Sequence, residues 1–246
     1  MDIKYVFRLI AYLFFSLILV VLIILPILEL KDLKFTNLIY DKRFLLSLFF
    51  GLETSIIATI LSSIFGIPTG YYLARNQGFF VKFLDSIFDI PLIIPPLIIG
   101  AMLLIFFNKV LPNFIFTIKG AVIAQFFISF PYVLKSAKNS FELVTDIYEN
   151  IAMTLGANPF RSFFDTTFKI SFGSILSGII LSWIRSFGEF GATLLVGGGI
   201  SNKTENIPIY IYQTISEGQF EKGLSASILI IFVGLIFLFM IKRKFS

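Results

Sequence analysis

The sequence predicts an all-α protein that crosses a membrane several times. Hydrophobic residues make up 57% of the 246 residues, charged residues only 14%, and the mean hydropathy is +0.92. A chain of this composition cannot cover a water-soluble globule with polar side chains. Its apolar residues instead gather in stretches of about 20 residues, the length a helix needs to cross the hydrocarbon core of a bilayer. We therefore expect one polytopic transmembrane domain over residues 1–246.

Six stretches are long or apolar enough to be transmembrane helices. They cover residues 6–28, 44–73, 87–107, 120–134, 172–196 and 224–241. The fourth stretch is the weakest, because it is short and contains Gln125 and Pro131. Pro91, Pro95 and Pro96 interrupt the third stretch. Broken helices often border a substrate route, and a kink that serves packing is the alternative explanation.

The distribution of Lys and Arg predicts the orientation of the chain. If the N-terminus is cytoplasmic, that side holds Lys4, Arg8 and the basic run 242–244, and it carries a modest excess of basic residues. Six spans then place both termini and a long loop, residues 135–169, in the cytoplasm. A cleaved signal peptide is the alternative for the first stretch, but no small-x-small site follows it. The net charge of +5 fits this bias and does not indicate nucleic-acid binding.

The chain contains neither Cys nor His. Their absence removes the usual thiolate and imidazole metal ligands, any disulfide, and every Ser-His or Cys-His nucleophile arrangement. Residues 197–204, GGGISNKT, resemble a phosphate-binding loop but lack its second glycine and a preceding strand. We expect no catalytic residue, no metal site and no cofactor in this chain.

A polar segment inside the long loop predicts two short helices. Residues 146–155 place Ile147, Ile151 and Leu155 on one helix face. The glycine after Leu155 is suited to end that helix, and the Asn-Pro pair at 158–159 is a typical start for the next. A small amphipathic helix on the water side of a membrane protein is a candidate docking element. A loop helix packed on the protein's own surface is the alternative.

The fifth apolar stretch carries two opposite charges. Arg185 and Glu189 are four residues apart, so on a continuous helix they share a face and pair. Leaving either charge unpaired at the centre of a bilayer costs about 2.5–3.5 kcal/mol. Beside them, small residues repeat every fourth position from Ser174 to Ser186 and let another helix or a hydrated path approach closely. Spacing leaves two roles open, a structural ion pair and a gate in the outer half of the membrane.

Several segments together resemble the permease subunits of ABC importers. The loop sequence GANPFRSFF is similar to the family's EAA loop, and with RSFGEFGATLL it resembles the molybdate/tungstate branch, sulfate permeases being next closest. The resemblance extends to DIPLIIPPLIIG at 89–100 and NIPIYIY at 206–212. Where the family has Glu-Ala-Ala, this chain has Asn150-Ile151-Ala152, with Glu149 one place earlier. Where the family often has Leu-Pro, this chain has Phe168-Lys169.

The resemblance implies the type I permease fold and a subunit that is not itself an enzyme. It implies a homodimer in a prokaryotic cell membrane, in which each copy docks a cytoplasmic subunit that binds ATP and Mg. An extracytoplasmic binding protein would deliver molybdate or tungstate. The alternatives are a sulfate or thiosulfate permease and, from other classes, a polytopic membrane enzyme or an ion channel.

The same resemblance implies two sets of site residues. The residues expected to couple to the ATPase are Tyr148, Glu149, Asn150, Ile151, Ala152, Leu155, Gly156, Ala157, Pro159 and Phe160. The residues expected to line or gate the translocation path are Ser177, Ser182, Arg185, Ser186 and Glu189.

Overall fold

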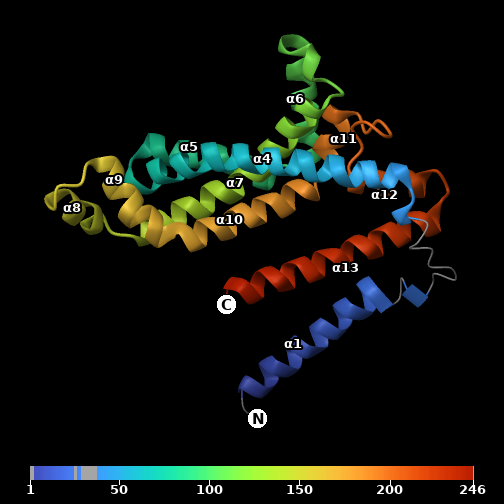
Figure 1. Ribbon diagram of the computed structural model, residues 1–246, viewed down its shortest axis with the longest axis horizontal. Helices are drawn as coiled ribbons and strands as arrows, with labels where there is room; N and C mark the ends of the chain where they lie inside the picture. The colour runs from blue at the N-terminus through green and yellow to red at the C-terminus, as the bar shows by residue number, and fades with distance from the viewer. Residues whose placement is uncertain (1–2, 25–26, 29–37, 246) are drawn as a thin grey trace. The chain divides into compact units, whose positions relative to one another are not determined.

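The computed structural model describes residues 3–24, 27–28 and 38–245, and the regular structure within these ranges is helical throughout (Figure 1). This confirms the all-α prediction. The chain forms two compact units, one from residues 1–45 and 209–246 and the other from Leu46–Pro208. Part of the first predicted span, 6–28, lies outside the described residues.

Four described helical segments are long and apolar enough to cross a membrane. They are Ile3–Leu22, which contains α1 (Ile3–Leu19), then α4 (Lys42–Arg75), α7 (Ile118–Leu143) and the segment Pro159–Phe187 that ends in α10 (Lys169–Phe187). A sharply bent helix pair adds a fifth if it counts as one span. The sixth predicted stretch lies within α13 (Phe220–Phe245). The count of six spans therefore stays a prediction, whereas α7 is clearly longer than the predicted 120–134.

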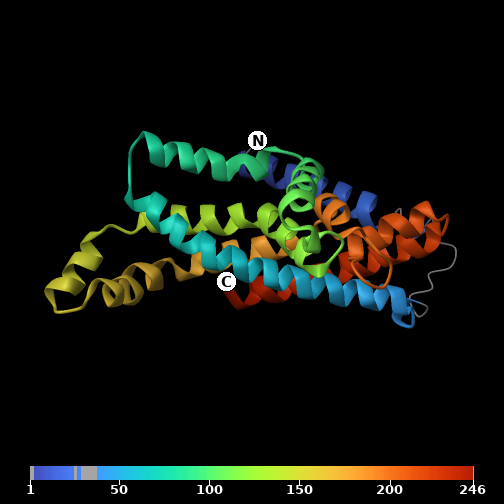
Figure 2. The same ribbon diagram turned by 90° about the horizontal axis from the view of Figure 1, so that it is seen from above.

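The larger unit is built around α7 and α10, which run side by side in both views (Figure 1 and Figure 2). Small residues allow this close approach. A Cβ added at Gly178 of α10 would lie 2.3 Å from the Cβ of Ser136 on α7, so only glycine fits there. The Ser136 hydroxyl donates to the Ser174 carbonyl at 2.7 Å. The small-residue ridge predicted from spacing is therefore a helix-packing face.

The α4 helix packs against α7 in the same way. A Cβ at Gly70 would lie 2.8 Å from the Cβ of Ala137, and the hydroxyls of Ser62 and Ser129 lie 3.1 Å apart. Hydroxyl pairs between buried helices satisfy polar groups that would otherwise lack a partner in an apolar interior.

The third predicted span is not one straight helix. Residues 87–107 fall on α5 (Phe79–Ile93) and α6 (Pro96–Val110), whose axes differ by 109°. Ile94 and Pro95 between them are extended, with ψ values of 135° and 134°. A residue before proline is driven out of the helical region, and Pro96 then supplies a favourable first residue for α6. Pro91 remains inside α5, so the break that the sequence placed among three prolines occurs at the last two.

The fifth predicted span, 172–196, is also interrupted. The α10 helix ends at Phe187, and a separate helix, α11 (Gly191–Gly197), follows after three residues. In Figure 1, α6 and α11 lie together at one end of the larger unit, and α8 (Ile147–Thr154) and α9 (Pro159–Phe163) at the other.

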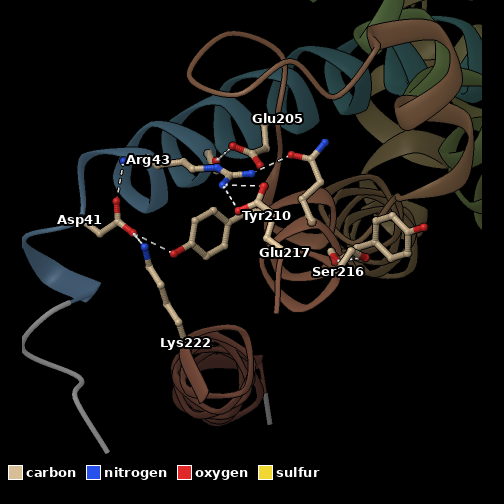
Figure 3. Close-up of polar contacts among 10 residues, drawn as sticks. Asp41, Arg43, Glu205, Tyr210, Ser216, Glu217 and Lys222 are labelled. Carbon is tan, nitrogen blue, oxygen red and sulfur yellow. Dashed lines mark hydrogen bonds and ion pairs between the residues drawn. The ribbon is translucent and has the colours of Figure 1, made fainter. Parts of the chain in front are cut away.

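The smaller unit contains a polar network beside the start of α4 (Figure 3). Asp41 accepts hydrogen bonds from the Tyr210 hydroxyl of α12 (Ile207–Ser216) at 2.9 Å and pairs with Lys222 of α13 at 2.5 Å. Arg43 forms an ion pair with Glu217 at 2.9 Å. Burial alone raises the pKa of the Asp41 carboxyl, but hydrogen bonds from Lys222 and Tyr210 outweigh it and hold that pKa below its ordinary value. This network joins α4, α12 and α13 within the unit.

Candidate functional site

The loop between α7 and α10 ends its first helix as the sequence predicts. Gly156 has φ +94°, which favours glycine, and nothing lies within 4 Å of a Cβ added there. Its N–H donates to the Met153 carbonyl, and the Ala157 N–H donates to the Ala152 carbonyl, both at 3.0 Å. This pair of bonds is a Schellman motif, which satisfies the last carbonyls of α8. The helix itself stops at Thr154, one residue before the predicted end.

The second loop helix also begins as predicted. Asn158 caps α9 by accepting a hydrogen bond from the Arg161 backbone N–H at 2.8 Å. Pro159 occupies the first helical position, where its missing N–H costs nothing. The direction of the chain through the loop is therefore set by one glycine and one Asn-Pro pair.

An apolar face of this loop is open to solvent. Ile147, Tyr148 and Ile151 of α8 are exposed, and Leu155 is 83% exposed. Phe160 at the start of α9 is 74% exposed. A contiguous set of large exposed apolar side chains is typical of a surface that another protein covers. These side chains have no cover from the described part of the chain.

Glu149 differs from the other predicted coupling residues, because its carboxylate points toward the body of the unit. It accepts hydrogen bonds from the Tyr71 hydroxyl at 2.9 Å and from Thr167 of η3 (Phe164–Phe168), and it lies 3.5 Å from Arg75. Only 13% of its side chain is exposed. Sequence reasoning missed Tyr71, Arg75 and Thr167, which have no local spacing that pairs them with residue 149.

Arg185 and Glu189 form the ion pair that their spacing predicts, at 2.6 Å. The geometry differs from a continuous helix, because Glu189 lies in the break after α10. Its carboxylate also accepts a hydrogen bond from the Ala192 backbone N–H at 2.9 Å. It thereby caps the N-terminus of α11, the end of a helix at which a negative charge is favourable. The Asn206 amide donates to the Glu189 carbonyl at 2.6 Å. Glu189 is 1% exposed, whereas the Arg185 side chain is 30% exposed.

The serines predicted to line a path lie on two sides of α10. Ser182 and Ser186 are fully buried, and the Ser186 hydroxyl donates to Gln125 of α7 at 3.3 Å. Ser177 is exposed, and its hydroxyl donates to the Gly173 carbonyl at 3.1 Å. Ser177 and Arg185 therefore reach the surface of the unit, and the two buried serines contribute to packing against α7.

A second ionic cluster joins α5 to α7. Lys135 contacts Asp85 at 2.8 Å and Asp89 at 2.7 Å, and Lys138 contacts Asp85 at 2.7 Å. These ion pairs and an edge-on contact between the Phe88 and Phe130 rings, with centroids 5.6 Å apart, attach α5 to α7.

No group of three or more Asp or Glu side chains in the described part of the chain could hold a metal ion. The acidic residues described above are paired with cations instead.

Comparison with known proteins identifies the family to which this chain is similar. Residues 66–245 match the model described as "Binding-protein-dependent transport system inner membrane component". The chain is 37% identical over 194 residues to the molybdate/tungstate transport system permease protein WtpB of Pyrococcus abyssi, covering 75% of this chain and 77% of that one. The WtpB of Methanocaldococcus jannaschii is 32% identical over 216 residues, covering 85% of each chain.

One solved structure shares the fold. A chain in the crystal structure of a bacterial ABC transporter involved in the import of the acidic polysaccharide alginate aligns with a TM-score of 0.64 over 99% of this chain and 97% of that one. The sequence identity is 15%, so this likeness concerns the fold alone.

Removing Arg185 is expected to cost more stability than removing the charge of Glu189. Arg185→Met leaves a buried carboxylate without its counter-ion, which costs about 3–5 kcal/mol in a buried pair. Glu189→Gln leaves an arginine that reaches solvent and retains an oxygen for the Ala192 N–H. The double variant should recover part of the loss in thermal unfolding of the purified chain in detergent. Equal, additive losses would contradict the pairing.

Proposed function

The chain belongs to the family of binding-protein-dependent transport system inner membrane components, and from this premise we propose that it imports a tetrahedral oxyanion, molybdate or tungstate. It is a membrane permease subunit and not an enzyme; ATP is hydrolysed by a separate subunit of the transporter. The observation that carries the substrate proposal is the identity of 37% to a relative named for molybdate and tungstate.

We further propose that the exposed apolar face of α8 and α9 docks the ATP-binding subunit. Support comes from the exposed side chains of Ile147, Ile151, Leu155 and Phe160, which the described part of this chain leaves uncovered. ATP and Mg then belong to the partner. Two copies of this chain form the transporter and receive the anion from an extracytoplasmic binding protein.

The proposed translocation path follows α10 and its break. Arg185 supports this proposal because it is a partly exposed cation on a segment long enough to cross the membrane, where charges usually mark a functional route. Ser177 lies on the exposed side of the same helix. Glu189, Ser182 and Ser186 are the buried residues that hold α10 and α11 in place beside such a path.

The chain is proposed to lie in the prokaryotic cell membrane with both termini and the α8–α9 loop in the cytoplasm. The excess of Lys and Arg on that side supports this orientation. Single cysteines can be labelled without background because the native chain has none. An impermeant maleimide should label Ser201→Cys in intact cells and should not label Leu143→Cys, although both positions are exposed. Labelling at position 143 would contradict the orientation.

The substrate proposal predicts which anion stimulates the assembled transporter. The permease, its ATPase and its binding protein are reconstituted in liposomes, and ATP hydrolysis is measured with molybdate, tungstate, sulfate or phosphate. Hydrolysis should rise with molybdate and tungstate and remain at the basal rate with phosphate. Stimulation by sulfate alone would assign the chain to the sulfate class instead.

Gly156→Val is expected to weaken docking of the ATPase and so to reduce anion uptake. A β-branched residue at φ +94° costs about 1–3 kcal/mol of backbone strain and redirects the chain toward α9. The matched control is Gly78→Val, because Gly78 also has a positive φ and open space around it but lies between α4 and α5. ATPase affinity and anion uptake should fall for the first variant and stay near wild type for the second. Equal behaviour of both variants would show that strain at position 156 has no special role.

A further inference from the structure

The α8 helix is attached to the rest of its unit by polar contacts. No residue of α8 is buried, so the helix has no apolar core of its own against the body. The Glu149 carboxylate instead meets the Tyr71 hydroxyl, Thr167 and Arg75, and the Ser162 hydroxyl donates to the Glu149 carbonyl at 2.7 Å. One residue of α8 thus joins α4, α9 and η3.

Arg75 occupies the centre of this arrangement. Its Nε lies 2.9 Å from Asp146, just before α8, and one terminal nitrogen donates to the Phe141 carbonyl at the end of α7 at 2.9 Å. The other terminal nitrogen lies 3.5 Å from Glu149. The contacts with Phe141 and Glu149 are hydrogen bonds, and the contact with Asp146 is an ion pair without hydrogen-bond geometry. A planar guanidinium holds several acceptors in fixed directions, which a lysine ammonium on a flexible chain does less well. Arg75 thereby links the last turn of α4 to the end of α7, to Asp146 just before α8 and to Glu149 in the first turn of α8.

The side chains that hold Glu149 are themselves held in place. The Tyr71 ring packs edge-on against Phe141 and Phe163, with centroid distances of 5.4 Å and 4.7 Å. The Arg75 guanidinium lies over the Tyr71 ring, 5.4 Å from its centroid. Thr167 is fully buried in the π-helical turn η3, a type of irregular turn that often marks functional positions. The side chains around Glu149 are therefore fixed by the body of the unit, and α8 is the element that they position.

We propose that Arg75 and Glu149 form a polar clamp that transmits displacement of α8 to α4 when the ATPase moves, and that Glu149 does not contact the ATPase. Arg75, Tyr71 and Glu149 are positioning residues in this role. The inference rests on the proposed docking of an ATPase to the open face of α8. Its physical basis is that the exposed side chains of Ile147, Ile151 and Leu155 face outward while Glu149 faces the body. The α8 helix therefore presents one side to the ATPase and the opposite side to the body of the unit.

The clamp predicts a loss of coupling without a loss of binding. In Glu149→Gln the side chain keeps its shape but loses its charge, and hydrogen bonds to charged groups are the stronger ones. Arg75→Lys keeps the charge but replaces the planar, fixed donors with a flexible ammonium that holds these acceptors less well. In the reconstituted transporter, anion transported per ATP hydrolysed should fall at least about fivefold in both variants, the lower end of typical coupling effects. Affinity for the ATPase should stay within about twofold of wild type, because contacts outside the interface contribute little to its binding energy.

Hydrogen exchange of the full-length permease alone separates this inference from the docking proposal. The amides of α8 should exchange about tenfold faster in Glu149→Gln than in wild type, since local opening follows the loss of one charge-assisted contact. The control is Asp165→Asn, an equivalent change at an exposed carboxylate that pairs only with Arg161 four residues earlier. It should leave exchange, ATPase affinity and coupling unchanged.

Three results would overturn the clamp. Unchanged exchange of α8 in both clamp variants shows that these residues do not hold the helix. Unchanged transport per ATP shows that holding the helix does not serve coupling. Lower ATPase affinity with unchanged exchange shows that Glu149 contacts the partner. If the wild-type chain binds no ATPase, the docking proposal fails, while the exchange measurement still decides whether Arg75 and Glu149 position α8.

Discussion

Pairing of charges is the constraint on which the rest of this structure depends. In a chain with 57% hydrophobic residues, an ionised side chain in the protein interior is stable only beside a counter-ion or several hydrogen-bond donors. The larger unit meets this requirement at three places: Arg75 with Asp146 and Glu149, Lys135 with Asp85 and Asp89, and Arg185 with Glu189. Each place also joins two helical elements. These charge pairs thus help to fix which segments lie together.

The helix breaks follow a similar rule. Interrupting a helix leaves backbone N–H and C=O groups that need partners, and irregular backbone at membrane depth is tolerated only where protein or water supplies them. After α10, the Glu189 carboxylate supplies an acceptor for α11, and Asn206 bonds the Glu189 carbonyl. Between α5 and α6, Pro95 and Pro96 lack N–H groups altogether. The helices that follow the two breaks, α6 and α11, pack tightly against each other. A Cβ added at Gly100 of α6 would lie 2.7 Å from the Ala192 Cα of α11.

The two ends of the larger unit therefore differ in how they are built. At the α6–α11 end there is a compact buried apolar cluster that includes Phe107, Ala124 and Ile128. At the α8–α9 end, a polar clamp holds a helix whose apolar side chains face outward. Such a helix has few contacts with its own protein and so changes position more readily than the core beneath it.

Local chemistry in the sequence determined the features that depend on neighbouring residues. Hydrophobic stretches predict the helical membrane fold, Gly156 and Asn158-Pro159 predict the loop's turn, and the four-residue spacing of Arg185 and Glu189 predicts their pair. The remaining features join residues far apart in the chain, as with Lys135 and Asp85 or Arg75 and Glu149. Which helix lies next to which, and which side of α8 faces the body, follow from packing among several helices at once. No spacing in the sequence encodes such contacts, so the inward direction of Glu149 and the break before Glu189 were decided only by the tertiary structure.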